Sequence, residues 1–194
     1  LADQLPVKVA GLVMDNDFGL AYELAFEQYA EANEDIVSDF VAIRHDPAAP
    51  TVTNEMTTIA AASPDVFISM TAGNPCLLAI QEADASGLLE SVSAAFTPSV
   101  CKGIAAYMAP AGMAADGWWI AGGGWKDTTD PNHIDEPYIA FVNQLLADAG
   151  LDPTVSLYGT GVAEFGWPMM EVLQLAQELP GGLSRTNFIL ALRS

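Results

Sequence analysis

Two carboxylates and an amide follow the first apolar run of the sequence, where Asp15-Asn16-Asp17 leads into Phe18-Gly19. Paired acids after a first strand can bind Mg²⁺ in phosphotransfer domains, but such sites also need a lysine or a phosphate-binding loop. The sequence contains no GxxxxGK[ST], and GTGVAEFG (159–166) has the wrong spacing for a dinucleotide loop. We therefore expect no metal at this turn. Asp17 is instead expected to cap a helix that begins near Gly19.

The two histidines are the only other residues that suggest catalysis. His45 stands beside Asp46, which could act as a base and the group that orients it, but no GxSxG or other nucleophile motif accompanies them. His133 lies among acids in a segment rich in turn residues and is expected in a solvated loop. The sequence therefore predicts no enzyme, no metal site and no cofactor.

The two cysteines lie 101 − 76 = 25 positions apart and form no CxxC or Cys/His pattern, which excludes a zinc site. Cys76 follows the third strand candidate and Cys101 the fourth. Sequential strands are usually neighbours in an open sheet, so their loops should meet. The residues alone allow either a disulfide, which would stabilise the fold by about 3 to 4 kcal/mol, or two buried thiols.

The composition is that of a globular protein that avoids nucleic acid. The chain has 194 residues, of which 51% are hydrophobic, and its mean hydropathy is +0.27. With 25 acids against six bases, the net charge of −19 repels phosphate backbones. No run of about eighteen apolar residues predicts a membrane-spanning helix. Because it begins at Leu1 without a signal sequence, we expect the chain to be a mature or truncated piece.

The elements that must position these residues alternate between strands and helices. Helical stretches separate most of the strand candidates, which favours right-handed crossovers and an open parallel sheet with helices on both faces. The predicted strands are Val7–Val13, Ile36–Ile43, Val66–Met70, Ser91–Phe96 and Gly117–Ile120. We therefore predict an α/β lobe over residues 1–121.

The rest of the chain has a different pattern. Residues 122–134 are rich in Gly, Asp, Thr and Pro and are predicted to form a linker or hinge. Residues 135–194 are predicted to be helical, with only the short strand-like segment VSLY (155–158) between the helices. The predicted helices are Glu136–Ala149, Val162–Leu179 and Leu183–Leu192.

In an open parallel sheet the ligand crevice lies at the carboxyl ends of the strands. The residues that follow the strands are therefore the site candidates. They are DNDFG (15–19), HDP (45–47), TAGNPC (71–76), TPSVC (97–101) and AGGGW (121–125). Phe18 and Trp167 each stand at the start of a predicted helix, where an aromatic ring can form the wall of a cleft.

The order of these pieces resembles the leucine/isoleucine/valine-binding family of ABC-transporter solute receptors. The resemblance rests on VAGLVMDNDFGLAYELAFEQYAEAN, on HDPAAPTVTNEMTTIAAASPDVFISMTAGNPCLLAIQEADASG after the next strand, and on LSRTNFILAL near the end. It covers nearly the whole chain. Its most specific marks are the acid-rich turn that ends in aromatic-Gly and the S-P-D-V-F strand entry.

The resemblance implies one lobe of a two-lobe periplasmic-binding fold. Members of the family close two α/β lobes, joined by three crossover strands, on a small ligand. The resemblance implies that residues 1–121 are the second lobe and that residues 135–194 are return helices that pack with a first lobe absent from this chain. It also implies an extracytoplasmic location, in the periplasm or at the cell surface, with a lipid anchor in a segment outside this chain as one arrangement. An oxidising location agrees with a disulfide between Cys76 and Cys101.

The resemblance also implies a set of ligand-binding residues. Phe18 matches the family's aromatic ligand contact, beside Asp17, and the loops after the third and fourth strands touch the ligand. Ser99 stands where amino-acid-binding relatives have an acid that pairs with the ligand's ammonium group. The full set is Asp17, Phe18, Thr71, Ala72, Gly73, Asn74, Thr97, Ser99, Phe165 and Trp167.

The implied function is binding without chemistry. The resemblance predicts the solute-binding component of an ABC importer, which holds a small polar or amino-acid-like ligand and presents it to a membrane permease. The alternative is a ligand-sensing domain of a membrane receptor with the same fold.

Overall fold

The computed structural model describes residues 2–122, 126–155, 158–159 and 161–194. The chain forms two compact units, Leu1–Trp125 and Lys126–Ser194, and each is described by itself. The predicted VSLY segment and the end of the AGGGW segment fall partly on residues outside the described ranges.

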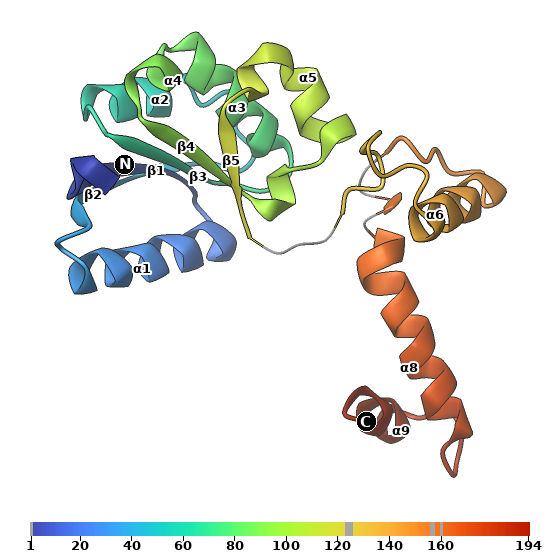
Figure 1. Ribbon diagram of the computed structural model, residues 1–194. Coiled ribbons are helices and arrows are strands. Elements are labelled where there is room, and N and C mark those ends of the chain that lie inside the picture. Colours follow the sequence, from blue (N-terminus) through green and yellow to red (C-terminus); the bar gives the residue numbers. More distant parts are fainter. Residues whose placement is uncertain (1, 123–125, 156–157, 160) are drawn as a thin grey trace. The chain divides into compact units, whose positions relative to one another are not determined.

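The first unit contains one parallel sheet of five strands in the order β2-β1-β3-β4-β5 (Figure 1). This confirms the predicted α/β fold class. The strands are β1 (Val7–Met14), β2 (Val37–His45), β3 (Val66–Met70), β4 (Ala94–Pro98) and β5 (Trp118–Ala121).

Helices connect the strands of the first unit. The helices are α1 (Asp17–Ala32), α2 (Thr53–Ala61), α3 (Asn74–Ala85), α4 (Leu88–Ser91) and α5 (Ala109–Ala111). The connections also contain 3₁₀ turns at Ala2–Gln4, Ser99–Cys101 and Gly112–Ala115 and a π-helical turn at Ile104–Met108. The predicted strand start at Ser91 is wrong. Gly87 adopts the left-handed conformation with φ 74°, so the chain reverses there and makes the extra turn of α4 before β4 begins.

Side chains of alternate parity build a core on each face of the sheet. Leu12 and Phe67 pack with residues of α2 and α3 on one face. Val9 and Val66 pack with Phe26 of α1 on the other. Because successive strand residues point to opposite faces and both faces carry helices, β1 is apolar almost throughout.

Glu82 of α3 caps the neighbouring helix α2. The N-cap residue of α2, Val52, has no side chain that can accept a hydrogen bond. The Glu82 carboxylate accepts instead from the Val52 amide at 2.9 Å and from the hydroxyls of Thr51 and Thr53 at 2.8 and 2.9 Å. A carboxylate at this position satisfies a backbone donor and complements the positive end of α2.

Glu82→Ala is expected to lower the free energy of unfolding by about 2 kcal/mol, because it leaves the part-buried Val52 amide without its charged acceptor. Urea denaturation followed by circular dichroism measures the change. Glu90→Ala is the matched control, since Glu90 is an exposed acid in the next helix, α4. Equal denaturation midpoints for the two variants would contradict the capping role.

The second unit is helical. It contains α6 (Pro137–Asp148), a π-helical turn at Gly161–Gly166, α8 (Trp167–Glu178) and α9 (Arg185–Leu192). The three predicted helices are present with shifted ends. The predicted start at Val162 falls in the π-helical turn, and α8 proper begins at Trp167. Across the described residues of both units, no helix combines the length and the apolar character needed to cross a membrane.

Candidate ligand-binding site

The strand order puts the topological switch point of the sheet at the carboxyl ends of β1 and β3. These two strands are neighbours in the sheet, but α1 leaves β1 toward one face and α3 leaves β3 toward the other. The chain therefore leaves the two strands toward opposite faces, and the position between their ends, here called the β1–β3 crevice, is where open α/β sheets bind ligands. Residues 15–18 and 71–74 border this crevice.

The loop after β1 is held by Asn16. Its side-chain oxygen accepts a hydrogen bond from the Gly19 amide at 3.1 Å, and its backbone is extended, as an N-cap requires. The prediction that Asp17 caps the helix is therefore wrong: Asp17 is the first residue inside α1. There its exposed carboxylate still complements the positive end of the helix.

Mutation can separate the roles of Asn16 and Asp17 in stabilising α1. Asn16→Ala is expected to lower the free energy of unfolding by about 1 kcal/mol, because the Gly19 amide loses its acceptor. Asp17→Ala removes only a dipole interaction and is expected to cost about 0.5 kcal/mol or less. Denaturation midpoints of both variants test this order. A larger loss for Asp17→Ala would restore the carboxylate as the cap.

Phe18 lies at the crevice end of α1. It is half-buried, and its ring centroid lies 5.0 Å from that of Tyr22, one turn further along the helix. This contact limits the directions that the Phe18 ring can take. The position and the partial exposure leave the ring able to contact a ligand in the crevice.

Part of the loop after β3 makes hydrogen bonds inside the protein and is not available to a ligand. The Thr71 side chain is fully buried, and its hydroxyl shares a hydrogen bond of 2.7 Å with the hydroxyl of Ser69. The Ala72 amide donates to the sulfur of Met14 at 3.0 Å, which joins this loop to the end of β1. Gly73 and Asn74 are exposed. The parts of this loop that a ligand can reach are therefore Gly73 and Asn74, with part of Ala72.

The loop after β4 also contains one buried residue and one that solvent reaches. Thr97 is 1% exposed, and its hydroxyl has no hydrogen-bond partner within the described part of the chain. Ser99 is partly exposed and begins the 3₁₀ turn that ends at Cys101. Of the two predicted contacts in this loop, Ser99 is the one that solvent reaches.

A disulfide joins the β3 and β4 loops. Cys76 and Cys101 are bonded, with 5.4 Å between their Cα atoms, and both are buried against Tyr107. This confirms the predicted meeting of the two loops and leaves no free thiol in the described residues. The bond holds the start of α3 against the Ser99–Cys101 turn. Burial raises the pKa of the Tyr107 hydroxyl above its ordinary value, because the charged phenolate would be poorly solvated there.

His45 does not form with the Asp46 side chain the base-and-orienter pair that their adjacency in the sequence allowed. His45 is buried, and its Nδ1 lies 3.0 Å from the main-chain oxygen of Asp46. The Asp46 carboxylate accepts instead from the Ala48 amide at 2.8 Å. His45 Nε2 has no hydrogen-bond partner within the described residues.

A charged pair links the end of β2 to helix α1. Arg44 at the end of β2 donates from Nε to Glu23 of α1 at 3.0 Å, and this hydrogen bond raises the pKa of Arg44 further above its ordinary value. Sequence reasoning missed this pair. Glu23 occupies an inward, buried position of the α1 helical period, and a charge at such a position is a signal for an ion-pair partner. In the described ranges no group of three His, Cys, Asp or Glu side chains could hold a metal ion.

The remaining two predicted contacts belong to the second unit. Phe165 lies in the π-helical turn and is 69% exposed. Trp167 is the first residue of α8, and its ring meets that of Phe141 on α6 edge-on with 5.7 Å between the centroids. Both aromatics thus stand at the beginning of a long helix.

No family model and no curated protein matches the sequence, but solved structures match the fold. A branched-chain amino acid ABC transporter protein from Thermus thermophilus with bound valine aligns with a TM-score of 0.78 at 18% identity, over 98% of this chain and 47% of that one. A solute-binding protein of an ABC transporter from R. palustris, in complex with 4-hydroxybenzoate, aligns with a TM-score of 0.69 at 18% identity, over 98% and 49%.

An amino acid ABC transporter substrate-binding protein from Pseudomonas fluorescens aligns with a TM-score of 0.61 at 15% identity, over 97% of this chain and 46% of that one. The chain therefore spans about half the length of the structures that it matches. At these identities the likeness is one of fold. The chain has the fold of the leucine/isoleucine/valine-type solute-binding proteins of ABC transporters, and its five-stranded unit is one lobe of that fold.

Proposed function

We propose that the chain is part of the extracytoplasmic solute-binding component of an ABC importer, and that it binds a small organic ligand at the β1–β3 crevice. The observation that carries this proposal is the divergence of α1 and α3 at neighbouring strand ends. The residues at that crevice combine a half-buried aromatic ring, Phe18, with polar groups that solvent reaches.

The reachable groups suggest the ligand's chemistry. Asn74 and Ser99 offer hydrogen bonds, Phe18 offers an apolar surface, and Asp17 offers a negative charge to a cationic group. A small polar or amino-acid-like molecule with a compact apolar body fits this combination. The neighbours' ligands, valine and 4-hydroxybenzoate, are both small carboxylic acids with an apolar body.

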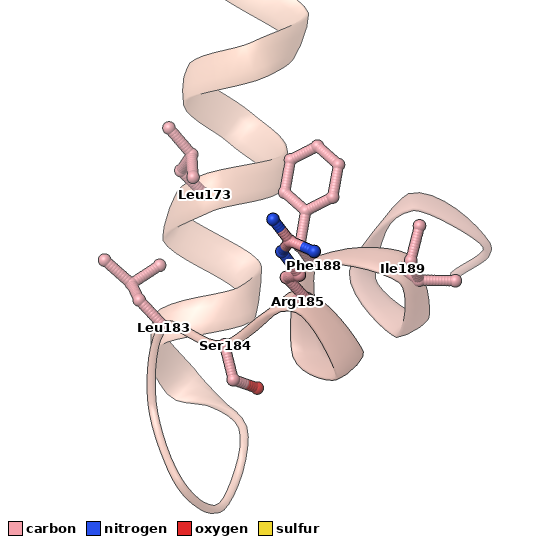
Figure 2. Close-up of a pocket in the computed structure, with 6 residues that line it drawn as sticks. All are labelled: Leu173, Leu183, Ser184, Arg185, Phe188 and Ile189. Carbon is pink, nitrogen blue, oxygen red and sulfur yellow. The ribbon is translucent and has the colours of Figure 1, made fainter.

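We propose that the second unit packs with a first lobe that would close the crevice from the opposite side. A hollow of about 410 Å³ lies between α8 and α9 and is lined almost entirely by apolar groups (Figure 2). Leu183 and Ile189 at this hollow are 61% and 45% exposed. The gathering of exposed apolar side chains at one hollow supports packing against another lobe. In the proposed mechanism, closure of the two lobes removes water from the ligand and presents the closed form to a permease.

The disulfide supports an oxidising, extracytoplasmic compartment. A lipid anchor supplied by a segment outside residues 1–194 is one way in which such a component would be held near its permease. Detection of the protein in the periplasmic or membrane-surface fraction of its source cells tests the location. Recovery in the cytoplasmic fraction alone would contradict it.

The experiment that tests the function is a thermal-shift screen of the protein expressed from its complete gene. The screen uses amino acids, their amides and small aromatic carboxylates, because these share the proposed chemistry. A binder is expected to raise the unfolding temperature progressively, with the logarithm of its concentration once that exceeds the dissociation constant. Calorimetry on each hit then gives the affinity. No shift with any of the three classes would contradict the proposed ligand chemistry.

Phe18→Ala is expected to weaken the binding of such a ligand about tenfold or more, because it removes an aromatic surface from the crevice. Leu24→Ala is the matched control: Leu24 is an exposed apolar residue on the same helix, 56% accessible, and lies two turns from the loop. Calorimetric titration of both variants measures the effect. Unchanged affinity in Phe18→Ala would remove Phe18 from the site.

A further inference from the structure

Ser99 lies beside the end of the neighbouring strand β5. Pro98, the last residue of β4, is the register partner of Ala121, the last residue of β5. The two strands run parallel and side by side (Figure 1). The next residue on the β4 side is Ser99, and the next on the β5 side is Gly122. The chain therefore leaves both strands at the same level of the sheet, with Gly122 next to Ser99.

The backbone of Gly122 approaches the Ser99 side chain so closely that only glycine fits. A β-carbon added to Gly122 would lie 2.9 Å from the Ser99 Oγ and 3.0 Å from the Ser99 Cβ. Carbon atoms in contact normally lie about 3.5 to 4.0 Å apart. Gly122 also has a φ of 128°, which residues with a side chain rarely adopt. The contact and the backbone conformation therefore both require glycine at this position.

The turn that begins at Ser99 is fixed at its other end. Cys101 ends this 3₁₀ turn, is fully buried, and is bonded to Cys76 near the start of α3. The Lys102 amide donates to the main-chain oxygen of Ser99 at 3.3 Å and closes the turn. Because the disulfide holds the far end, a side chain at position 122 would have to displace Ser99 within the turn. The Ser99 hydroxyl would then change its place at the crevice.

We infer that Gly122 is a positioning residue for ligand binding. Because Gly122 has no side chain, the Ser99 hydroxyl can lie against the end of β5, in the place from which it offers a hydrogen bond to the ligand. This role rests on the proposed function, since it takes Ser99 as a ligand contact. Gly122 acts through Ser99 and needs no ligand contact of its own. It thereby favours ligands that carry a hydrogen-bonding group toward the end of β4.

The test is a double-mutant cycle in the protein expressed from its complete gene, titrated by calorimetry with valine and with 4-hydroxybenzoate. Gly122→Ala is expected to weaken binding about three- to tenfold, the loss of one hydrogen bond. Ser99→Gly is expected to weaken it by a similar factor. In the Ser99→Gly background, Gly122→Ala should add a loss of about twofold at most, because the side chain that it displaces is gone. A role of Gly122 in folding alone would weaken binding about equally in both backgrounds.

Gly117→Ala is the matched control for backbone strain. Gly117 directly precedes β5 and has a φ of 81°, but nothing lies within 4 Å of an added β-carbon. Alanine at this position meets the left-handed conformation without a contact to Ser99. Gly117→Ala is therefore expected to leave the affinity for both probes unchanged.

Hydrogen exchange of the Lys102 amide gives a second readout that needs no ligand. This amide is expected to exchange severalfold faster in Gly122→Ala than in the unmutated protein, because a displaced Ser99 opens the turn that it closes. Gly117→Ala should leave its exchange unchanged. In the Ser99→Gly background, Gly122→Ala should make no further difference.

Unchanged exchange in Gly122→Ala would overturn the positioning role of Gly122. Unchanged affinity in this variant, for a probe that the unmutated protein binds, would also overturn it while the proposed function stands. If the unmutated protein binds neither valine nor 4-hydroxybenzoate, that result counts against the proposed ligand chemistry. The exchange of the Lys102 amide then decides the role of Gly122 by itself.

Discussion

Gly19→Ala is expected to lower the free energy of unfolding by about 3 kcal/mol or more, although alanine normally favours a helix. A β-carbon at this position would lie 2.0 Å from the main-chain oxygen of Met14 and 2.7 Å from its nitrogen. Both are backbone atoms at the end of a central strand, so neither can move without disturbing the sheet. The first turn of α1 would have to shift away from β1, and Phe18 would move with it.

Gly87→Ala is the matched control for this prediction. Gly87 has a φ of 74°, and nothing lies within 4 Å of an added β-carbon. Alanine there suffers only the strain of the left-handed conformation, about 1 to 2 kcal/mol. Chemical denaturation of both variants measures the difference. If Gly19→Ala proved no more costly than Gly87→Ala, the close approach of α1 to Met14 would be wrong, and with it the placement of Phe18 at the crevice.

The fold could be predicted because its main signals are local. Apolar runs such as Val7–Val13 and Val66–Met70 alternate with amphipathic stretches, and that alternation alone favours a parallel sheet. The position of the crevice follows from the same rule, since it depends only on which residues follow each strand. Helix α4 was missed because four residues are too few to show a helical period.

The cap of α1 was misassigned because Asn and Asp are nearly equal as N-caps. The choice depends on where the strand ends. β1 continues to Met14, so the helix begins at Asp17 and the cap falls on Asn16. Prediction of this detail would need the exact end of the strand, which sequence periodicity does not give.

Whether a predicted site residue can contact a ligand depends on the face of the sheet to which its side chain points. Thr71 has the same parity as Phe67 and Ser69, so it points to the α3 face and is buried. Counting alternate residues from Phe67 would have revealed this. Asn74 escapes the rule because it lies beyond the strand, at the start of α3. The partners of Phe165 and Trp167 depend on structure outside the first unit and could not be derived from local pattern.

The disulfide has a consequence for binding as well as for stability. Cys76 lies two residues beyond Asn74, and Cys101 lies two residues beyond Ser99. The bond therefore fixes the distance between the two loops that carry Asn74 and Ser99, the polar side chains proposed to contact the ligand. A ligand that contacts both loops meets groups already held in place, so less conformational freedom is lost on binding.

Replacement of both cysteines by alanine is expected to lower the free energy of unfolding by about 3 to 4 kcal/mol, because the bond closes a loop of 25 residues in the unfolded chain. The affinity for a ligand that spans the two loops is expected to fall as well.

Alanine also removes two buried sulfur atoms, so unmutated protein held in reductant is the control that keeps the packing. Urea midpoints of the oxidised, reduced and alanine forms separate the two effects. If the oxidised and reduced forms unfold at the same urea concentration, and both thiols titrate freely after denaturation without reductant, the loops are not joined covalently. Their alignment at the crevice would then rest on packing around Tyr107 alone.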